Sequence, residues 1–210
     1  ASLQGIEYGY FTYKPSVSNA CQFLTIQNCV VTMTKGTSAY VIGIHISNGA
    51  LTVSSATGVV VNANSGRSEN ITISGNTVQN VHAGIYCRGN SSTAFYDQNI
   101  TVSGNTIQNF GGGSATTTYG VYFIYTNHPT VTGNTINNAG GGGSAHASTF
   151  YGVFYSTVSG VVIGSSNTIT MNTSGTAAVQ GIYNGNVVTS NTFSANTFSG
   201  SVAATSTSYL

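Results

Sequence analysis

Only a few side chains in this chain of 210 residues carry the charge that acid–base chemistry needs. The sequence holds four Lys or Arg and three Asp or Glu, and the three carboxylates are Glu7, Glu69 and Asp97. Hydrolysis of a glycosidic bond by acid–base catalysis needs two carboxyl groups roughly 5 to 9 Å apart. Glu69 directly precedes one copy of a repeated segment, and Asp97 lies two residues before the next copy. These two carboxylates are therefore the one pair expected to lie on corresponding turns.

Two cations lie near this pair in the sequence, Arg67 and Arg88. A cluster of surface ion pairs, each worth about 0 to 1 kcal/mol, accounts for the arrangement without any catalysis. We therefore predict no catalytic residue and keep Glu69 and Asp97 as a weak alternative acid/base pair.

The remaining chemically active residues are scattered. Calcium needs six to eight oxygen ligands with several carboxylates among them, and zinc needs His or Cys ligands at characteristic spacings. The His and Cys residues match no such spacing: His45, His82, His128, His146, Cys21, Cys29 and Cys87. We expect no metal and no cofactor, and at least one of the three cysteines must be free or paired between chains.

The composition excludes further classes of partner. Charged residues make up 3% of the chain and its formal net charge is +1, whereas ordinary domains are about 25% charged. Nucleic acid and anionic membrane surfaces are therefore not expected as partners. No apolar run approaches the roughly 20 residues that span a bilayer, so membrane insertion is not expected.

One segment recurs along the chain. Residues 70–80 read NITISGNTVQN, residues 99–109 read NITVSGNTIQN, and residues 129–138 read PTVTGNTINN. The Asn-Thr pairs that begin at Asn76, Asn105 and Asn134 are 29 residues apart twice (105−76 and 134−105). A fixed period of this length indicates a repeat architecture.

Within each unit the residues alternate with the period of a β-strand. Ile71 and Ile73 flank Thr72, a Gly-Asn turn follows, and a third segment begins with glycine and alternates again. That glycine recurs at Gly43, Gly84, Gly120, Gly152 and Gly181. Three short strands per unit describe one triangular coil, and coils of this kind must stack to bury their inner face.

The predicted fold is therefore an all-β, three-sided parallel β-solenoid of about seven coils. We expect first strands at Leu24, Leu51, Ile71, Ile100, Val131, Val161 and Val187. The chain divides into an aromatic-rich cap or assembly segment (1–22), the solenoid (23–200) and a β-prone tail (201–210). The Gly-rich stretches 111–118 and 140–147 are expected to be loops that leave the rod.

Asparagine recurs at one corner of each coil. Its side chain tolerates the left-handed conformation of a tight turn, and stacked amides hydrogen-bond to the coils above and below. We expect a structural ladder of Asn28, Asn76, Asn105, Asn134, Asn167 and Asn191.

The units ISGNTV and VSGNTI, with Gly-Ile-Tyr in the next strand, resemble the right-handed parallel β-helix repeats of the pectate-lyase-like superfamily over residues 23–200. The resemblance implies the fold, but that architecture serves lyases, glycosidases, adhesins and phage tail proteins alike. Its enzymes work with clustered carboxylates, a calcium site or a basic residue, and this chain lacks such a cluster.

An aromatic stripe is expected on the outside of the third segment. If Ile44, Ile85, Val121, Val153 and Ile182 point inward, the outward residues are His45, Tyr86, Tyr122, Phe154 and Tyr183, with Val60 in the short coil and Tyr125 and Tyr151 beside them. Such rings contact another protein copy, bind carbohydrate, or lie under the chain's own loops. Outward threonines (Thr72, Thr101, and Thr130 or Thr132) suggest an ice-binding array, but the outward positions are too mixed to favour it.

The N-terminal segment 6–13 is strongly aromatic, with Tyr8, Tyr10 and Phe11, and the tail is uncharged. Because neither end carries the charges that usually prevent edge pairing, the leading hypothesis is a secreted, non-enzymatic structural protein of the extracellular space or cell surface. It would self-associate end to end or side by side into a filament or surface layer. The alternatives are a β-helix that binds or cleaves polysaccharide, and a fragment of an adhesin or phage fibre.

Overall fold

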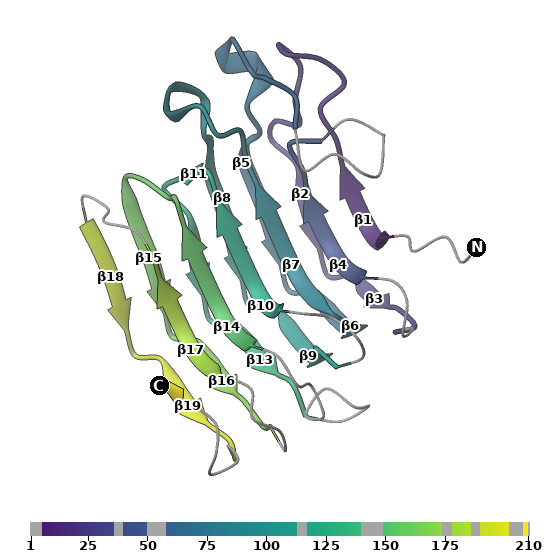
Figure 1. Cartoon of the computed structure of the whole chain (residues 1–210), viewed down its shortest axis with the longest axis vertical. Helices are drawn as coiled ribbons and strands as arrows, with labels where there is room; N and C mark the ends of the chain where they lie inside the picture. The colour runs from purple at the N-terminus through teal and green to yellow at the C-terminus, as the bar shows by residue number, and fades with distance from the viewer. Residues whose placement is uncertain are drawn as a thin grey trace.

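The computed structural model describes residues 6–35, 40–49, 58–112, 117–139, 149–173, 178–185, 190–201 and 208–209. They form a β-solenoid of about five turns, built from three parallel sheets that run side by side along the molecule (Figure 1). Each turn contributes one strand to each sheet, because its three short alternating segments are separated by tight corners. The first residues of β1 and the strand β19 lie toward opposite ends of the stack of coils, which is called the rod below (Figure 1).

The first sheet has seven strands in the order in which they occur along the chain. They are β1 (Ile6–Thr12), β4 (Tyr40–Ile46), β7 (Ala83–Arg88), β10 (Thr117–Ile124), β14 (Thr149–Ser156), β17 (Val179–Asn184) and β20 (Ser208–Tyr209). The segment 1–22, expected as a cap or assembly segment, supplies a strand of the solenoid, since β1 pairs in parallel with β4. The tail likewise supplies β20, which pairs with β17.

The second and third sheets have six main strands each. The second holds β2 (Thr25–Gln27), β5 (Glu69–Ser74), β8 (Asp97–Ser103), β12 (Thr130–Thr132), β15 (Val161–Ser165) and β18 (Ser190–Ser194), with β11 (Thr126–Asn127) beside β8. The third holds β3 (Val30–Thr32), β6 (Thr77–Val81), β9 (Thr106–Phe110), β13 (Thr135–Asn137), β16 (Thr168–Thr170) and β19 (Thr197–Ser199). Two short 3-10 helices, η1 (Asn64–Gly66) and η2 (Thr93–Phe95), interrupt the connections into the second sheet.

The register confirms the repeat. Ile71 lies opposite Ile100, and Thr101 lies opposite Thr130, so the Asn-Thr segments stack in phase. The predicted number of coils was too high, because β2 pairs directly with β5 and β4 directly with β7, which leaves no coil between them. Leu51 and Val187 lie outside the described residues, and the last strand of the second sheet begins at Ser190.

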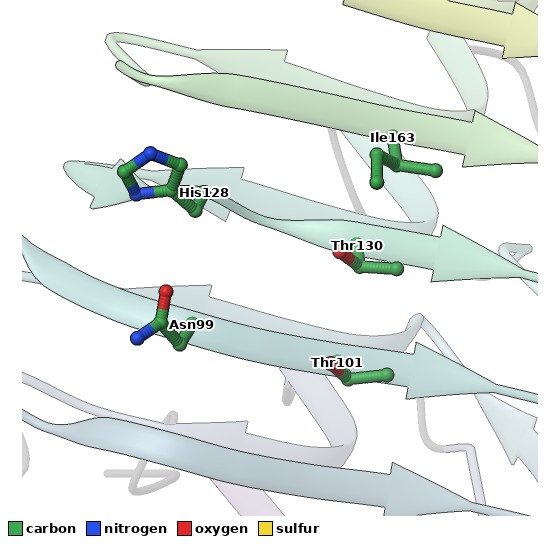
Figure 2. A pocket seen from close by; sticks show the side chains of 5 residues that line it. All are labelled: Asn99, Thr101, His128, Thr130 and Ile163. Atoms are coloured by element: carbon green, nitrogen blue, oxygen red, sulfur yellow. The ribbon is translucent and has the colours of Figure 1, made fainter.

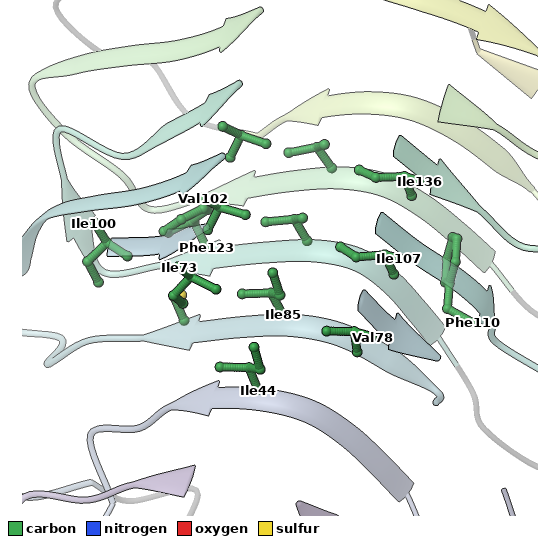
Figure 3. Close-up of a cluster of buried hydrophobic side chains, with 14 of the residues drawn as sticks. Ile44, Ile73, Val78, Ile85, Ile100, Val102, Ile107, Phe110, Phe123 and Ile136 are labelled. Atoms are coloured by element: carbon green, nitrogen blue, oxygen red, sulfur yellow. The ribbon is translucent and has the colours of Figure 1, made fainter. Parts of the chain in front are cut away.

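The core consists of inward side chains stacked in columns, as Figure 3 shows for Ile44 and Ile85 and for Val78, Ile107 and Ile136. The inward prediction for the first sheet is confirmed: Ile44, Ile85, Val121 and Val153 are fully buried, and Ile182 packs against the core from the last turn. Close packing of this kind makes the stack of coils rigid.

The recurring glycine, expected to begin this segment, lies inside strands β4, β7, β10, β14 and β17, and a close approach of the backbone requires it there. A Cβ atom on Gly84 would lie 2.5 Å from the carbonyl oxygen of Gly120 and 2.6 Å from Cγ2 of Ile107. The same conflict recurs at Gly120, with Gly152 and Ile136. Glycine therefore lets the third sheet's Ile column press against the first sheet at this corner.

Candidate functional site and binding surfaces

A ladder of asparagines occupies the corner between the second and third sheets. Asn105 Oδ1 accepts hydrogen bonds from the backbone N–H and Nδ2 of Asn76, both at 2.9 Å, and Asn105 Nδ2 donates to Ile73 O (2.9 Å) and to Asn134 Oδ1 (3.0 Å). The same pattern continues to Asn167 and Asn196. Each amide thus satisfies backbone groups that would otherwise be buried without partners, which is a structural role.

The two end members of the predicted ladder were wrong. Asn191 lies opposite Val162 in the second sheet, and Asn196 occupies the ladder position instead. The repeat spacing could have identified this position, because Asn196 lies 29 residues beyond Asn167, the same spacing that separates the earlier Asn-Thr pairs. At the other end Cys29, not Asn28, takes the position, and its backbone N–H donates to Asn76 Oδ1 at 2.9 Å.

The left-handed residue of this corner comes just before the ladder position. Gly75, Gly104 and Gly133 have φ between 61° and 64°, and Asn28 has φ 55° at the same place. Asn28 thus provides the turn and not the ladder amide, since asparagine tolerates this conformation better than most side chains.

Asp97 is fully buried and ion-paired. Its Oδ1 accepts hydrogen bonds from Lys14 Nζ (2.5 Å) and from the backbone N–H of Ser68 (2.8 Å), and both side chains of the ion pair have zero exposure. Burial raises the pKa of Asp97 to about 6, although Lys14 and Ser68 oppose the shift. Burial also lowers the pKa of Lys14, and Asp97 opposes that shift.

Glu69 lies in a different environment. Its Oε2 accepts hydrogen bonds from Arg67 Nε (2.8 Å) and Gln98 Nε2 (3.0 Å), and about 17% of its side chain is exposed. The expected surface cluster is therefore confirmed for Glu69 and Arg67 and wrong for Asp97. Because Asp97 is closed off from solvent and engaged by Lys14, the two carboxylates do not form an acid/base pair on one accessible face.

A second cation, missed in the sequence, reaches across the corner between the third and first sheets. Lys35 Nζ donates to Asn109 O (2.9 Å), Asn109 Oδ1 (2.9 Å) and Gly111 O (2.7 Å). Burial lowers its pKa to about 8. All three ammonium donors have oxygen partners, so Lys35 fastens the first coil to a coil two levels away.

The aromatic stripe on the first sheet is in register. Tyr86, Tyr122, Phe154 and Tyr183 lie opposite one another in successive strands. Phe11 extends the row beyond His45. Val60 is not part of it, because His45 pairs directly with Tyr86.

The rings of this row stack on one another. The centroids of Tyr86 and Tyr122 are 4.2 Å apart with planes 15° apart, and Tyr122 and Phe154 are 5.2 Å apart with planes 6° apart. Phe154 and Tyr183 continue the stack at 4.8 Å. Neighbouring rings therefore occupy each other's faces, which are the surfaces on which a sugar ring would stack.

Tyr125 and Tyr151 were both expected to flank this row, and only Tyr151 does. Tyr151 flanks the stripe and meets Phe154 edge-on at 4.6 Å, whereas Tyr125 lies beyond the end of β10 and contacts Tyr96 at 5.9 Å.

The centre of the row is well covered, since only 8% of Tyr122 is exposed. Burial raises the pKa of Tyr122 far above its usual value. The stretches 113–116 and 140–147, expected as loops, lie outside the described residues.

His45 sits in the same row with only 8% of its surface exposed. Its ring contacts Tyr8 (5.3 Å), Phe11 (5.5 Å) and Tyr86 (5.1 Å), and within the described chain neither ring nitrogen has a hydrogen-bond partner. Burial, with a smaller contribution from the Arg88 charge, lowers its pKa to about 3. The imidazole is therefore neutral at ordinary pH and packs as an aromatic ring.

A hollow of about 340 Å³ lies on the outer face of the second sheet (Figure 2). It is lined by Asn99, Thr101, His128, Thr130 and Ile163. His128 is exposed and shares the left-handed position of Asn99 in the coil below, with φ 54° at both. The hollow offers hydroxyl, amide and imidazole groups but no charged side chain.

Both ends of the rod expose large apolar side chains among polar ones. In the first coil, Phe23 is 74% exposed, Val30 is 72% exposed and Tyr10 is 42% exposed, and the Tyr10 hydroxyl lies 3.5 Å from Cys29 Sγ. At the opposite end, a pocket of about 460 Å³ is lined in part by Ile182, Phe193 and Phe198.

Three findings complete the description. Within the described parts of the chain, no group of three or more His, Cys, Asp or Glu residues is placed to hold a metal ion. The same parts contain no helix long and apolar enough to cross a membrane. Comparisons with protein-family models, curated proteins and solved structures found no significant match.

Proposed function

We propose that this chain is a non-enzymatic structural β-solenoid whose copies associate end to end into a filament. The observation that carries the proposal is the first coil, where exposed apolar side chains replace the polar ones of the inner coils. Phe23 occupies the column of Asn70, and Val30 the column of Thr77. Exposed apolar surface of this kind is typical of a contact site.

Phe23 strengthens the case because it is held in the left-handed region, with φ 57°. A bulky residue there costs of order 1 to 3 kcal/mol, and such strain is found at functional positions. The strained backbone presents a ring of which 74% is exposed.

The opposite end offers a surface of matching character. The pocket at the last coil is lined by the apolar side chains of Ile182, Phe193, Ala195 and Phe198 together with Asn184, Ser194 and Asn196. Contact between two different ends of the same molecule is heterologous, and a heterologous contact that does not close produces a filament. A net charge of +1 over 210 residues leaves little repulsion between copies.

We also propose that the protein lies outside the cell or on its surface and that it belongs to the pectate-lyase-like superfamily. The support for these two points is the uncharged composition and the repeated ISGNTV-type units. Binding of polysaccharide through the Tyr stripe is less favoured, because the ring faces are stacked against each other.

Sedimentation velocity and negative-stain microscopy test the proposal with Phe23→Lys/Val30→Lys. Both positions are exposed, so the variant should fold, and the charges should leave it monomeric while the wild type forms rods that lengthen with concentration. The matched control, Asn70→Lys/Thr77→Lys, places the same charges in the same columns one coil further in and should still assemble. A wild type that stays monomeric at all concentrations, or a control that dissociates equally, contradicts the proposal.

A further inference from the structure

The outer face of the third sheet carries a row of threonines in perfect register. β6, β9, β13, β16 and β19 each begin with one, and neighbouring strands pair these residues directly. The row consists of Thr77, Thr106, Thr135, Thr168 and Thr197. The sequence interpretation considered only threonines of the second sheet and did not find this row.

The five hydroxyl groups have no hydrogen-bond partner within the described chain, although many other polar side chains on this rod are paired. All five residues are at least partly exposed. Each presents a methyl group and a free hydroxyl, so the row offers alternating apolar and hydrogen-bonding contacts that only solvent or a ligand completes.

A second row runs beside the first, two residues further along each strand: Gln79, Gln108, Asn137, Thr170 and Ser199. Two pairs of neighbours in this row hold one another, since Gln108 Nε2 donates to Gln79 Oε1 at 2.5 Å and the hydroxyls of Thr170 and Ser199 are 3.0 Å apart. Side chains that are already ordered lose little entropy when they meet a surface.

The two rows form a rigid, neutral grid. Strands lie about 4.8 Å apart, and residues i and i+2 about 6.7 Å apart. The strands of this sheet contain no charged residue, and behind them the inward Val78, Ile107 and Ile136 are fully buried. The face therefore offers nothing to a charged ligand and a repeating pattern to a neutral one.

We propose that this face, centred on Thr106 and Thr135, binds ice. Water held by the free hydroxyls would repeat with the spacing of the coils, and the planes of ice present oxygen atoms in rows with similar spacings. An ice crystal is an extended, uncharged lattice of hydrogen-bonding groups, and it therefore matches an extended, uncharged grid on the protein. The second sheet is a poorer candidate, because Ile163 interrupts its Thr row beside the hollow in Figure 2.

The test is thermal hysteresis and inhibition of ice recrystallisation by the purified chain. The wild type should show both, and Thr106→Lys/Thr135→Lys should reduce the activity at least tenfold, because ammonium groups break the flat neutral grid. Thr106→Val/Thr135→Val keeps the methyl groups and removes the hydroxyls, and should cause a smaller loss.

The matched control is Thr101→Lys/Thr130→Lys, which places the same charges in the same coils on the second sheet and should keep at least half of the activity. Circular dichroism and thermal melting establish that each variant is folded. Absence of ice activity in the wild type, or equal loss in the control, overturns the proposal. Sedimentation reports end-to-end association separately, so failure of one proposal leaves the other standing.

Discussion

The first coil and the inner coils share one register but differ at the positions that face outward along the rod. Inner coils place Asn at the ladder position and Thr next to it, whereas the first coil has Cys29 and Val30. An inner Asn needs a coil on each side to satisfy its amide. Cys29 needs a neighbouring coil on one side only. Its backbone N–H donates to Asn76 Oδ1, and its thiol is a weak hydrogen-bonding group that needs no partner from a coil on the other side. The difference leaves exposed apolar side chains on the first coil, and the proposed end-to-end contact rests on them.

The first coil is nevertheless fastened firmly to the others. Lys14 reaches Asp97, 83 residues away, and Lys35 reaches Asn109 and Gly111, 74 and 76 residues away. Two of the four cations in the chain therefore tie the first coil to coils beyond its neighbour. These ties make the coil a stable platform while its outer side stays apolar.

Removal of the Lys14 tie should have the largest effect. Lys14→Met leaves Asp97 buried without its cation, so the free energy of unfolding should fall by about 3 to 5 kcal/mol, measured by urea denaturation. Lys14→Met/Asp97→Leu removes both charges and should recover most of the loss. Arg67→Met breaks the partly exposed pair with Glu69 and should cost less than about 1 kcal/mol. Equal losses in Lys14→Met and Arg67→Met would contradict the contrast between the two ion pairs.

Substitutions in the asparagine ladder should cost more stability in an inner coil than in the first coil. Asn105→Ala should lower the free energy of unfolding by about 3 kcal/mol, because buried groups of Asn76, Ile73 and Asn134 lose partners. Cys29→Ala keeps the backbone hydrogen bond and should cost less than about 1 kcal/mol. Chemical denaturation of the two variants under the same conditions measures the difference, and similar losses would show that the amides are not the stabilising element.

His45 should make the molecule sensitive to acid. Its pKa is lowered to about 3 by burial and by Arg88, against about 6.5 in the unfolded chain, so the unfolded state binds more protons between these values. Stability is therefore lost as the pH falls through that range, by about 2 kcal/mol at pH 5 relative to neutral pH. The groups that face the ring are Tyr8, Phe11, Tyr86 and Arg88.

His45→Phe replaces the imidazole with the ring type that Phe154 provides in the same row. The variant should therefore not lose stability through position 45 as the pH falls. Asp97 acts in the opposite direction, because its raised pKa, about 6, makes the folded state bind more protons between about pH 4 and 6. The comparison of His45→Phe with the wild type cancels the Asp97 contribution. Melting temperatures from pH 4 to 7 provide the measurement, and parallel curves for the two proteins would exclude His45 as the cause.

The sequence predicted the features that repeat and missed those that join distant coils. Alternation of Ile71, Thr72 and Ile73 and the 29-residue spacing were enough for the solenoid, the three sheets and most of the ladder, because each is a local pattern. The number of coils was wrong because the segment after β4 contains apolar residues without adding a coil, which only the direct pairing of β4 with β7 reveals.

Contacts of the lysines could not be predicted, since Lys14 and Lys35 lie outside the repeats and their partners depend on where the chain enters the first coil. Asp97 was assigned to a surface cluster because Glu69, Arg67 and Arg88 lie near it in the sequence, whereas in the structure its partner is the buried Lys14. The threonine row of the third sheet, in contrast, was present in the spacing of Thr77, Thr106 and Thr135. It was missed because outward threonines were sought only in the segment that forms the second sheet.

The smallest effect expected is also the most specific test of end-to-end association. Asn196 is the last ladder residue, and in a head-to-tail contact its backbone N–H would meet position 29 of the next copy, as each inner Asn meets the following one. Cys29 supplies no amide there. Cys29→Asn should complete the ladder across the junction and strengthen association about threefold to tenfold, which corresponds to one net hydrogen bond. Sedimentation equilibrium measures the change. Cys21→Asn, outside the ladder, is the control, and an unchanged or weaker association of Cys29→Asn would mean that the ladders of successive copies are not in line.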